Sequence, residues 1–276
     1  MVAVGLAIMI VSQTATLAGI EPFASWNTPI AWTGFILFAD SLVYRARGNS
    51  WIRTSPREFI ALSLLSIPLW LVFEAFNLVI RNWHYIGLPE NFWLRMFGYA
   101  WSFATIWPAI FEAADLISVM RHRPSDVPVR AQPSSSSSPQ LALPTIGALM
   151  LASPFLVTAD VARYLAAPVW LGFILLLDPI NAARGEESVL RDWRAGRFDR
   201  TLNLMLSGFL CGGLWELWNY WAHAKWKYTV PIMENLKIFE MPLPGYLGFP
   251  AFALECFTMY VFVRSLIGRP GRPIAL

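Results

Sequence analysis

The chain has 276 residues, of which 56% are apolar and only 14% are charged, and its formal net charge is +3. Charged residues make up about a quarter of a soluble globular protein, so this composition excludes that class, and nothing in it resembles a nucleic-acid footprint. Both cysteines lie inside apolar segments, which argues against a disulfide framework. We therefore expect an all-α, polytopic membrane protein.

Apolar segments near membrane-spanning length recur along the whole chain. The first has no basic region before it and is expected to be a retained span rather than a cleaved signal. Eight spans are predicted, at about 2–20, 28–44, 59–80, 98–119, 142–159, 163–180, 201–221 and 246–266. Pro68, Pro108 and Pro250 fall inside them, which membrane helices tolerate where neighbours satisfy the freed carbonyls.

A stretch rich in proline and serine separates the fourth and fifth spans. It contains the serine run from Ser134 to Ser138, between two prolines. This composition forms no core and predicts a flexible cytoplasmic linker over residues 121–141. The expected organisation is a first four-span repeat over residues 1–120, the linker, and a second four-span repeat over residues 142–276.

Arginines are concentrated after the even-numbered spans. They are Arg45, Arg47, Arg53, Arg57, Arg121, Arg123, Arg130, Arg184, Arg191, Arg194, Arg197, Arg200, Arg264, Arg269 and Arg272. With eight spans all of these lie on one face, together with both termini, and basic loops mark the cytoplasmic side. The prediction is an integral protein of the bacterial inner membrane with cytoplasmic termini.

The two halves of the sequence carry the same residues in the same order. The matched pairs are Trp32 and Trp170, Asp40 and Asp178, Glu74 and Glu216, Asn77 and Asn219, Trp83 and Trp226, Tyr85 and Tyr228, Pro108 and Pro250, and Glu112 and Glu255. Their offsets are nearly constant, so an internal duplication is expected. Four spans per copy predict parallel repeats, related by an axis along the membrane normal.

Glutamates inside the predicted spans are candidate catalytic groups, because an ionisable residue at a helix centre costs about 2.5–3.5 kcal/mol and normally faces the bundle interior. In a low-dielectric cavity such a carboxyl is expected to be protonated, and an Asn three residues later lies on the same helix face and can orient its hydroxyl. The alternative is that these residues only hydrogen-bond between helices. The candidates are Glu74, Asn77, Glu112, Glu216, Asn219 and Glu255.

Aromatic residues surround these acids. The chain has 14 Trp, many of which are expected to be ordinary interfacial anchors. Indole faces around an acid would also stabilise a carbocation by cation–π attraction. The candidate substrate-binding residues are Trp83, Tyr85, Trp107, Trp215, Trp218, Trp226 and Tyr228.

Other sites have less support. Asp40 and Asp178 are expected to cap helices or pair with arginine. No metal site and no cofactor is predicted, although Glu/Asn sets can hold hard cations and leave that alternative open. The sequence has no Gly-rich phosphate loop, no zinc-spaced Cys pair and no nucleophile elbow.

The order acid-x-x-Asn, then Trp-x-Tyr, then a proline followed by Glu, once per half, resembles the membrane-integral lycopene beta-cyclases and the related fungal meroterpenoid cyclases. The resemblance implies a repeated helical protein that protonates a polyene double bond without redox change. Glu74 and Glu216 resemble the acid before the aromatic motif, and Glu112 and Glu255 the acid after the proline. Here single glutamates stand four and five residues beyond the proline, where that family has adjacent glutamates two residues beyond it.

The leading hypothesis is an isomerase or intramolecular lyase that cyclises, isomerises or hydrates an isoprenoid-like lipid. Glu216 or Glu74 would donate the first proton, and Glu255 or Glu112 would accept the last. The alternatives are a transporter or lipid-binding protein, for which parallel repeats and midplane carboxyls are equally natural, and a structural subunit of a membrane complex.

Overall fold

The computed structural model describes residues 1–121, 141–268 and 271–276; nearly all of the predicted linker lies outside them. The helices are α1 (Val2–Leu17), α2 (Phe23–Arg47), α3 (Trp51–Thr54), α4 (Pro56–Ile80), α5 (Phe92–Ala104), α6 (Ile106–Met120), α7 (Ala142–Ala152), η1 (Ser153–Phe155), α8 (Ala159–Ala162), α9 (Ala166–Ala183), α10 (Val189–Arg194), α11 (Asp199–Trp221), η2 (Leu243–Leu247) and α12 (Gly248–Leu266). The strands are β1 (Trp83–Ile86), β2 (Lys225–Tyr228), β3 (Lys237–Ile238) and β4 (Met241–Pro242).

Helices dominate, as predicted, and each of the eight predicted spans contains one. Within the described part of the chain, four segments are long and apolar enough to cross a membrane: Pro56–Ile80, Phe92–Met120, Ala166–Ala183 and Leu243–Leu266. The helices Val2–Leu17 and Ala142–Phe155 are apolar but shorter. The count of eight crossings therefore stays a prediction.

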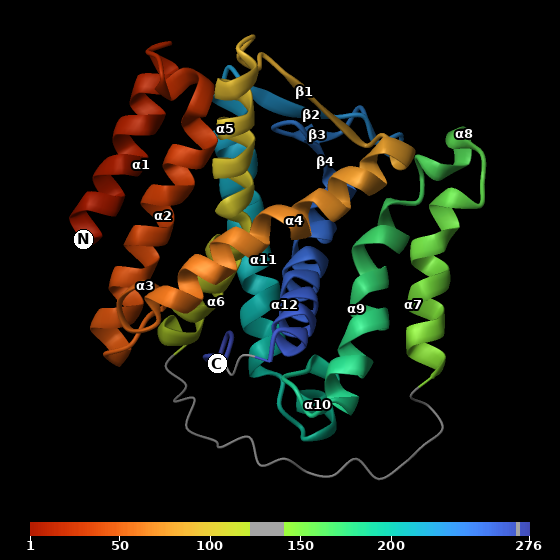
Figure 1. The fold of residues 1–276 in the computed structure, drawn as a ribbon. Helices are drawn as coiled ribbons and strands as arrows, with labels where there is room; N and C mark the ends of the chain where they lie inside the picture. Colours follow the sequence, from red (N-terminus) through yellow and green to blue (C-terminus); the bar gives the residue numbers. More distant parts are fainter. Residues whose placement is uncertain (122–140, 269–270) are drawn as a thin grey trace.

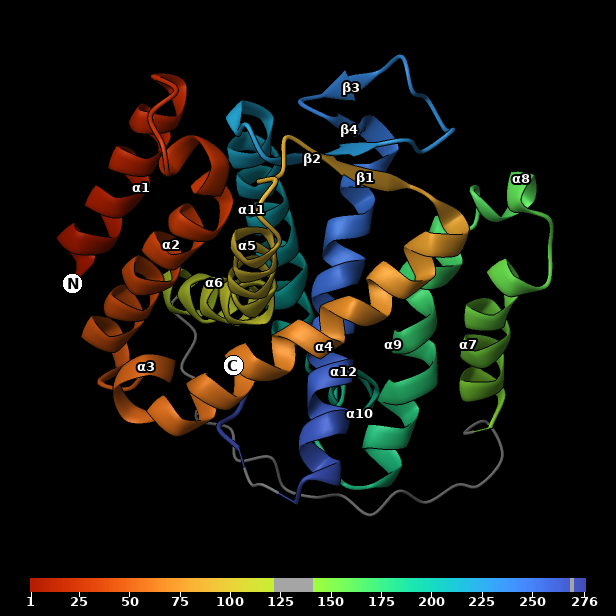
Figure 2. The same cartoon turned by 45° about the horizontal axis from the view of Figure 1, so that its top comes forward.

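The bundle has two different ends (Figure 1). The short helices α3 and α10 lie at one end with the C-terminus, and strands β1 to β4 lie at the other with α8. Most of the arginines named above belong to the first end. After rotation, α4 is seen to run obliquely across the other helices (Figure 2).

Glycine allows two helix pairs to approach closely. A Cβ on Gly5 of α1 would lie 2.5 Å from the carbonyl oxygen of Gly34 in α2. A Cβ on Gly147 of α7 would lie 2.7 Å from the carbonyl oxygen of Gly172 in α9. Small residues at such crossings let backbones pack directly on one another.

The predicted fourth span is interrupted between α5 and α6, at Thr105. The buried Ser66 hydroxyl of α4 satisfies groups on both sides of the break: it donates to the carbonyl of Phe103 and accepts from the amide of Trp107. Two of the prolines predicted inside spans, Pro108 and Pro250, lie in the first turns of α6 and α12. At these positions a proline removes no intrahelical hydrogen bond.

Asp40 and Asp178 cap helices, as predicted. Asp40 accepts a hydrogen bond from the amide of Ile52 in α3, at 2.8 Å. Asp178 accepts from the amides of Val189 and Leu190 in α10, at 2.9 and 2.8 Å. Each aspartate therefore fixes the short helix that follows its own long helix.

The end that carries α3 and α10 is joined by ion pairs. Arg264 of α12 contacts Glu187 at 2.7 Å and Glu58 of α4 at 3.4 Å. Arg272, in the C-terminal segment, contacts Asp115 of α6 at 2.8 Å. The buried Arg200 of α11 is paired with Glu187 and Asp192.

Candidate functional site

The two Trp-x-Tyr motifs, which belong to separate halves of the sequence, form one antiparallel ribbon. Trp83 is opposite Tyr228, and Tyr85 is opposite Trp226, around the central pair His84 and Lys227. Aromatic residues that alternate in a short segment favour strands, but the partner strand lies far away in the sequence. The ribbon brings the two motifs of the chain to a single place.

Asn77 and Asn219 hold the ribbon on its helices. The Asn77 side chain accepts from the amides of Asn82 and Trp83, at 2.8 and 3.2 Å, and donates to the carbonyl of Trp83 at 2.8 Å. The Asn219 side chain accepts from the amide of Trp226 and donates to its carbonyl, both at 2.9 Å. These amides bind strand backbone and no carboxyl, so they position the aromatic residues rather than orient the glutamates as expected.

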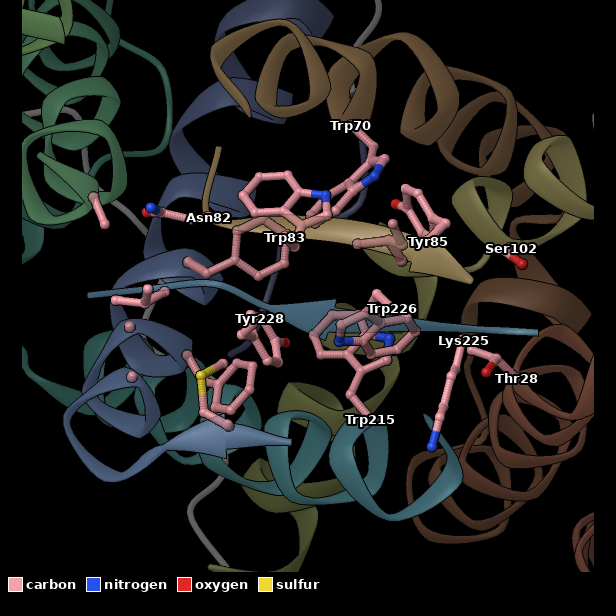
Figure 3. A pocket seen from close by; sticks show the side chains of 18 of the residues that line it. Thr28, Trp70, Asn82, Trp83, Tyr85, Ser102, Trp215, Lys225, Trp226 and Tyr228 are labelled. Atoms are coloured by element: carbon pink, nitrogen blue, oxygen red, sulfur yellow. The ribbon is translucent and has the colours of Figure 1, made fainter. Parts of the chain in front are cut away.

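A cavity of about 520 Å³ lies between the ribbon and helices α2, α5, α9 and α12. Figure 3 shows Trp70, Trp83 and Tyr85 gathered around β1, and Trp215, Trp226 and Tyr228 around β2. A cavity lined by aromatic faces, with few polar groups, suits an apolar or unsaturated ligand.

Five of the seven predicted substrate-binding residues line this cavity: Trp83, Tyr85, Trp215, Trp226 and Tyr228. Trp107 and Trp218 lie in the core instead. The Trp107 indole donates to the carbonyl of Cys256 at 2.8 Å, and the Trp218 ring packs edge-on against Trp32 at 4.7 Å between centroids.

Sequence reasoning missed several lining residues. Trp70 and Phe103 come from α4 and α5, Trp170 from α9, and Phe252 from α12. Trp70 had a usable signal, because it precedes Glu74 by four residues and so lies on the same helix face. For Phe103, Trp170 and Phe252, no spacing in the sequence indicates that the side chain lines a cavity.

Glu74 lies behind this aromatic wall and is half-buried. Its Oε1 accepts three hydrogen bonds: from the Trp70 indole at 2.8 Å, the Trp83 indole at 3.3 Å and the Tyr85 hydroxyl at 2.5 Å. All three donors line the cavity. Glu74 thereby fixes the side chains that a ligand would touch.

Glu216 occupies the matching place in α11 and is fully buried. Its Oε1 accepts from the Tyr228 hydroxyl at 2.9 Å, and its Oε2 has no hydrogen-bond partner among the described residues. Tyr228 lines the cavity, and Glu216 stands directly behind it.

The two phenols remain protonated under ordinary conditions. Burial, and then the nearby Glu74 carboxyl, raise the pKa of Tyr85 well above its ordinary value. Burial and Glu216 do the same to the pKa of Tyr228. At neutral pH each hydroxyl is therefore protonated and can donate a hydrogen bond toward its glutamate or a ligand.

Glu112 and Glu255 do not line the cavity. Both are fully buried in α6 and α12. Glu112 lies beside the Asp40 carboxyl, and neither of its oxygens accepts a hydrogen bond from an N–H or hydroxyl donor among the described residues. Glu255 accepts one long bond, of 3.4 Å, from the amide of Phe173. The structure thus separates the four predicted acids into two behind the cavity wall and two in the helix core.

Among the described residues, no group of three His, Cys, Asp or Glu is arranged to hold a metal ion. Comparisons with protein-family models, curated proteins and solved structures found no match. The resemblance to membrane-integral lycopene cyclases therefore stays a prediction based on the motifs.

Proposed function

We propose that this protein is an integral-membrane enzyme that binds an elongated isoprenoid-like lipid in the aromatic cavity. Its reaction is the addition and later loss of a proton, giving a cyclised, isomerised or hydrated product without redox change. The observation that carries the proposal is the pair of glutamate–tyrosine contacts, Glu74 with Tyr85 and Glu216 with Tyr228, whose phenols both face one aromatic cavity.

The chemistry needs a proton donor beside a carbon–carbon double bond. The proton adds to one carbon of the double bond and forms a new C–H bond. The π bond breaks, and a cation remains on the neighbouring carbon. Indole and phenol faces stabilise such a cation by about 0.5–2 kcal/mol each. Loss of a proton, or addition of water, then gives the product. Glu112 and Glu255 are given no role in this step because, unlike Glu74 and Glu216, neither accepts a hydrogen bond from a residue that lines the cavity.

The proposed protein is built from two parallel four-span repeats with eight crossings and cytoplasmic termini. Several matched contacts support the duplication: the strand register pairs each Trp with the Tyr of the other motif, and Asn77 and Asn219 make the same bonds. Arginines in α3, α10 and the neighbouring ends of α2, α11 and α12 support the orientation.

The test compares the apolar lipids of lycopene-producing bacteria that carry the wild-type protein or the double variant Glu74→Gln/Glu216→Gln. Mass spectrometry is expected to find a product of unchanged mass, or with the mass of one added water, only with the wild type. Both proteins must be present in the membrane in equal, folded amounts. Identical lipid profiles in the two strains would overturn the enzymatic proposal.

A transporter of the same kind of lipid is the second candidate. The interruption between α5 and α6 favours it, because transporters form binding sites at broken helices. This candidate predicts that an unaltered lipid co-purifies with the protein and is lost when Gly98, in the cavity wall, is replaced by Trp.

A further inference from the structure

The two glutamates differ in the number of hydrogen bonds that they accept. Glu74 Oε1 accepts from Trp70, Trp83 and Tyr85. Glu216 Oε1 accepts from Tyr228. The Trp226 indole and the Glu240 backbone amide approach the carboxyl, but Oε2 is buried without a partner at hydrogen-bond geometry among the described residues. A buried carboxyl oxygen left unpaired is costly when charged, and protonation removes that charge.

A single position explains much of the difference. Trp70 precedes Glu74 by four residues and gives it an indole donor, whereas the residue four before Glu216 is Gly212. A side chain cannot be accommodated there: a Cβ on Gly212 would lie 2.1 Å from the ring of Phe249. The Phe249 ring thus occupies the space of the missing donor.

A second difference lies above the two acids. The segment 229–247, which includes β3 and β4, follows β2 and contributes Met241 and Gly245 to the cavity wall. Its Glu240 pairs with Lys225 at 3.3 Å, and the Glu240 backbone amide approaches the Glu216 carboxyl. After β1, only five residues, 87–91, precede α5. The longer segment covers the site of Glu216, which is fully buried, while Glu74 is half-buried.

From these contacts we infer that the two acid sites have diverged: the Glu216–Tyr228 pair supplies the proton, and Glu74 is a positioning residue that holds the cavity wall. The inference rests on the proposed function and names the half of the molecule that performs it.

The step balances without a redox partner. When Glu216 is protonated, its carboxyl donates to the Tyr228 oxygen across the same 2.9 Å contact. The Tyr228 proton then passes to one carbon of the substrate double bond as the Glu216 proton replaces it on the phenol oxygen, which leaves Glu216 as a carboxylate and forms no phenolate. A carbon adjacent to the cation then loses a proton, which returns through the Tyr228 hydroxyl to the Glu216 carboxylate. The net result is a rearranged hydrocarbon and an unchanged protein.

The closing experiment compares Glu216→Gln with its matched control Glu74→Gln, in the lycopene-producing strain and as purified protein. Glu216→Gln is expected to reduce the product at least about 100-fold, the size of a lost general acid. Tyr228→Phe should have the same effect. Glu74→Gln should mainly raise KM and lower thermal stability, while kcat falls less than about tenfold. Equal losses of kcat in the two glutamine variants, or a larger loss in Glu74→Gln, would overturn the inference.

Infrared difference spectroscopy separates this result from failure of the proposed function. A protonated carboxyl has a carbonyl stretch that shifts in heavy water. That band should lose intensity in Glu216→Gln and keep it in Glu74→Gln, whether or not any lipid is converted. A wild type that makes no product but shows this band would overturn the proposed function alone. An unchanged band in Glu216→Gln would overturn the assignment of the proton to Glu216.

Discussion

The two ends of the bundle are held together by different forces. At the end with α3, α10 and the C-terminus, arginines from separate elements are paired with carboxylates, as Arg264 is with Glu58 and Glu187. At the ribbon end, Asn77 and Asn219 hold the two strands, and aromatic rings pack around the cavity that lies there. The ion pairs that join separate helices therefore lie at one end of the bundle, and the aromatic residues that would contact a ligand lie at the other.

The largest loss of stability is expected when an ion pair at the end with α3, α10 and the C-terminus is removed. Replacing Arg264 with Ala leaves the Glu187 and Glu58 carboxylates without this partner, and removing one member of a buried ion pair costs about 3–5 kcal/mol. Arg264 is only 8% exposed, so little of this is screened. Denaturant titration in detergent should show the loss, with the conversion per folded molecule unchanged. Arg57→Ala, at an exposed site of the same end, is the control. A stability loss shared by both variants would contradict the difference between the ends.

A smaller effect is expected at the ribbon end. Asn219→Ala removes both hydrogen bonds to Trp226 and should cost about 1–3 kcal/mol, the penalty of leaving buried polar groups unpaired. Because it also releases β2, it should reduce the amount of product more than Arg264→Ala does, relative to folded protein. Asn77→Ala makes the equivalent change on β1. If neither variant altered the product beyond its loss of folded protein, the ribbon would be only a structural connection.

The smallest effect concerns pH. The raised pKa values of Tyr85 and Tyr228 mean that the fold binds their protons more tightly than the unfolded chain does. Their contribution to stability is complete below about pH 10, the ordinary value for tyrosine, and falls as the pH rises beyond it. The double variant Tyr85→Phe/Tyr228→Phe should flatten the decline in melting temperature above pH 10. An unchanged slope would indicate that neither phenol is protected by the fold.

The sequence predicted the elements better than their partners. The helical character of the chain, the capping roles of Asp40 and Asp178, and five cavity residues follow from hydropathy, spacing and the internal matches, whereas the count of eight crossings stays a prediction. The ribbon does not, because strand pairing depends on two segments more than a hundred positions apart and no local pattern selects the partner. The placement of Trp107 in the core and of Trp70 in the wall depends on helix rotation, which composition does not fix.

The strand register also constrains the order of folding. β1 is synthesised well before β2, so the edge of β1 that pairs with β2 stays unpaired until the second half of the chain is made. Contacts of such long sequence separation form late and slowly. The cavity thus has no complete wall in a nascent chain, and a lipid cannot be enclosed until synthesis has passed β2. For a protein proposed to generate a carbocation, this order keeps a half-built site from reacting.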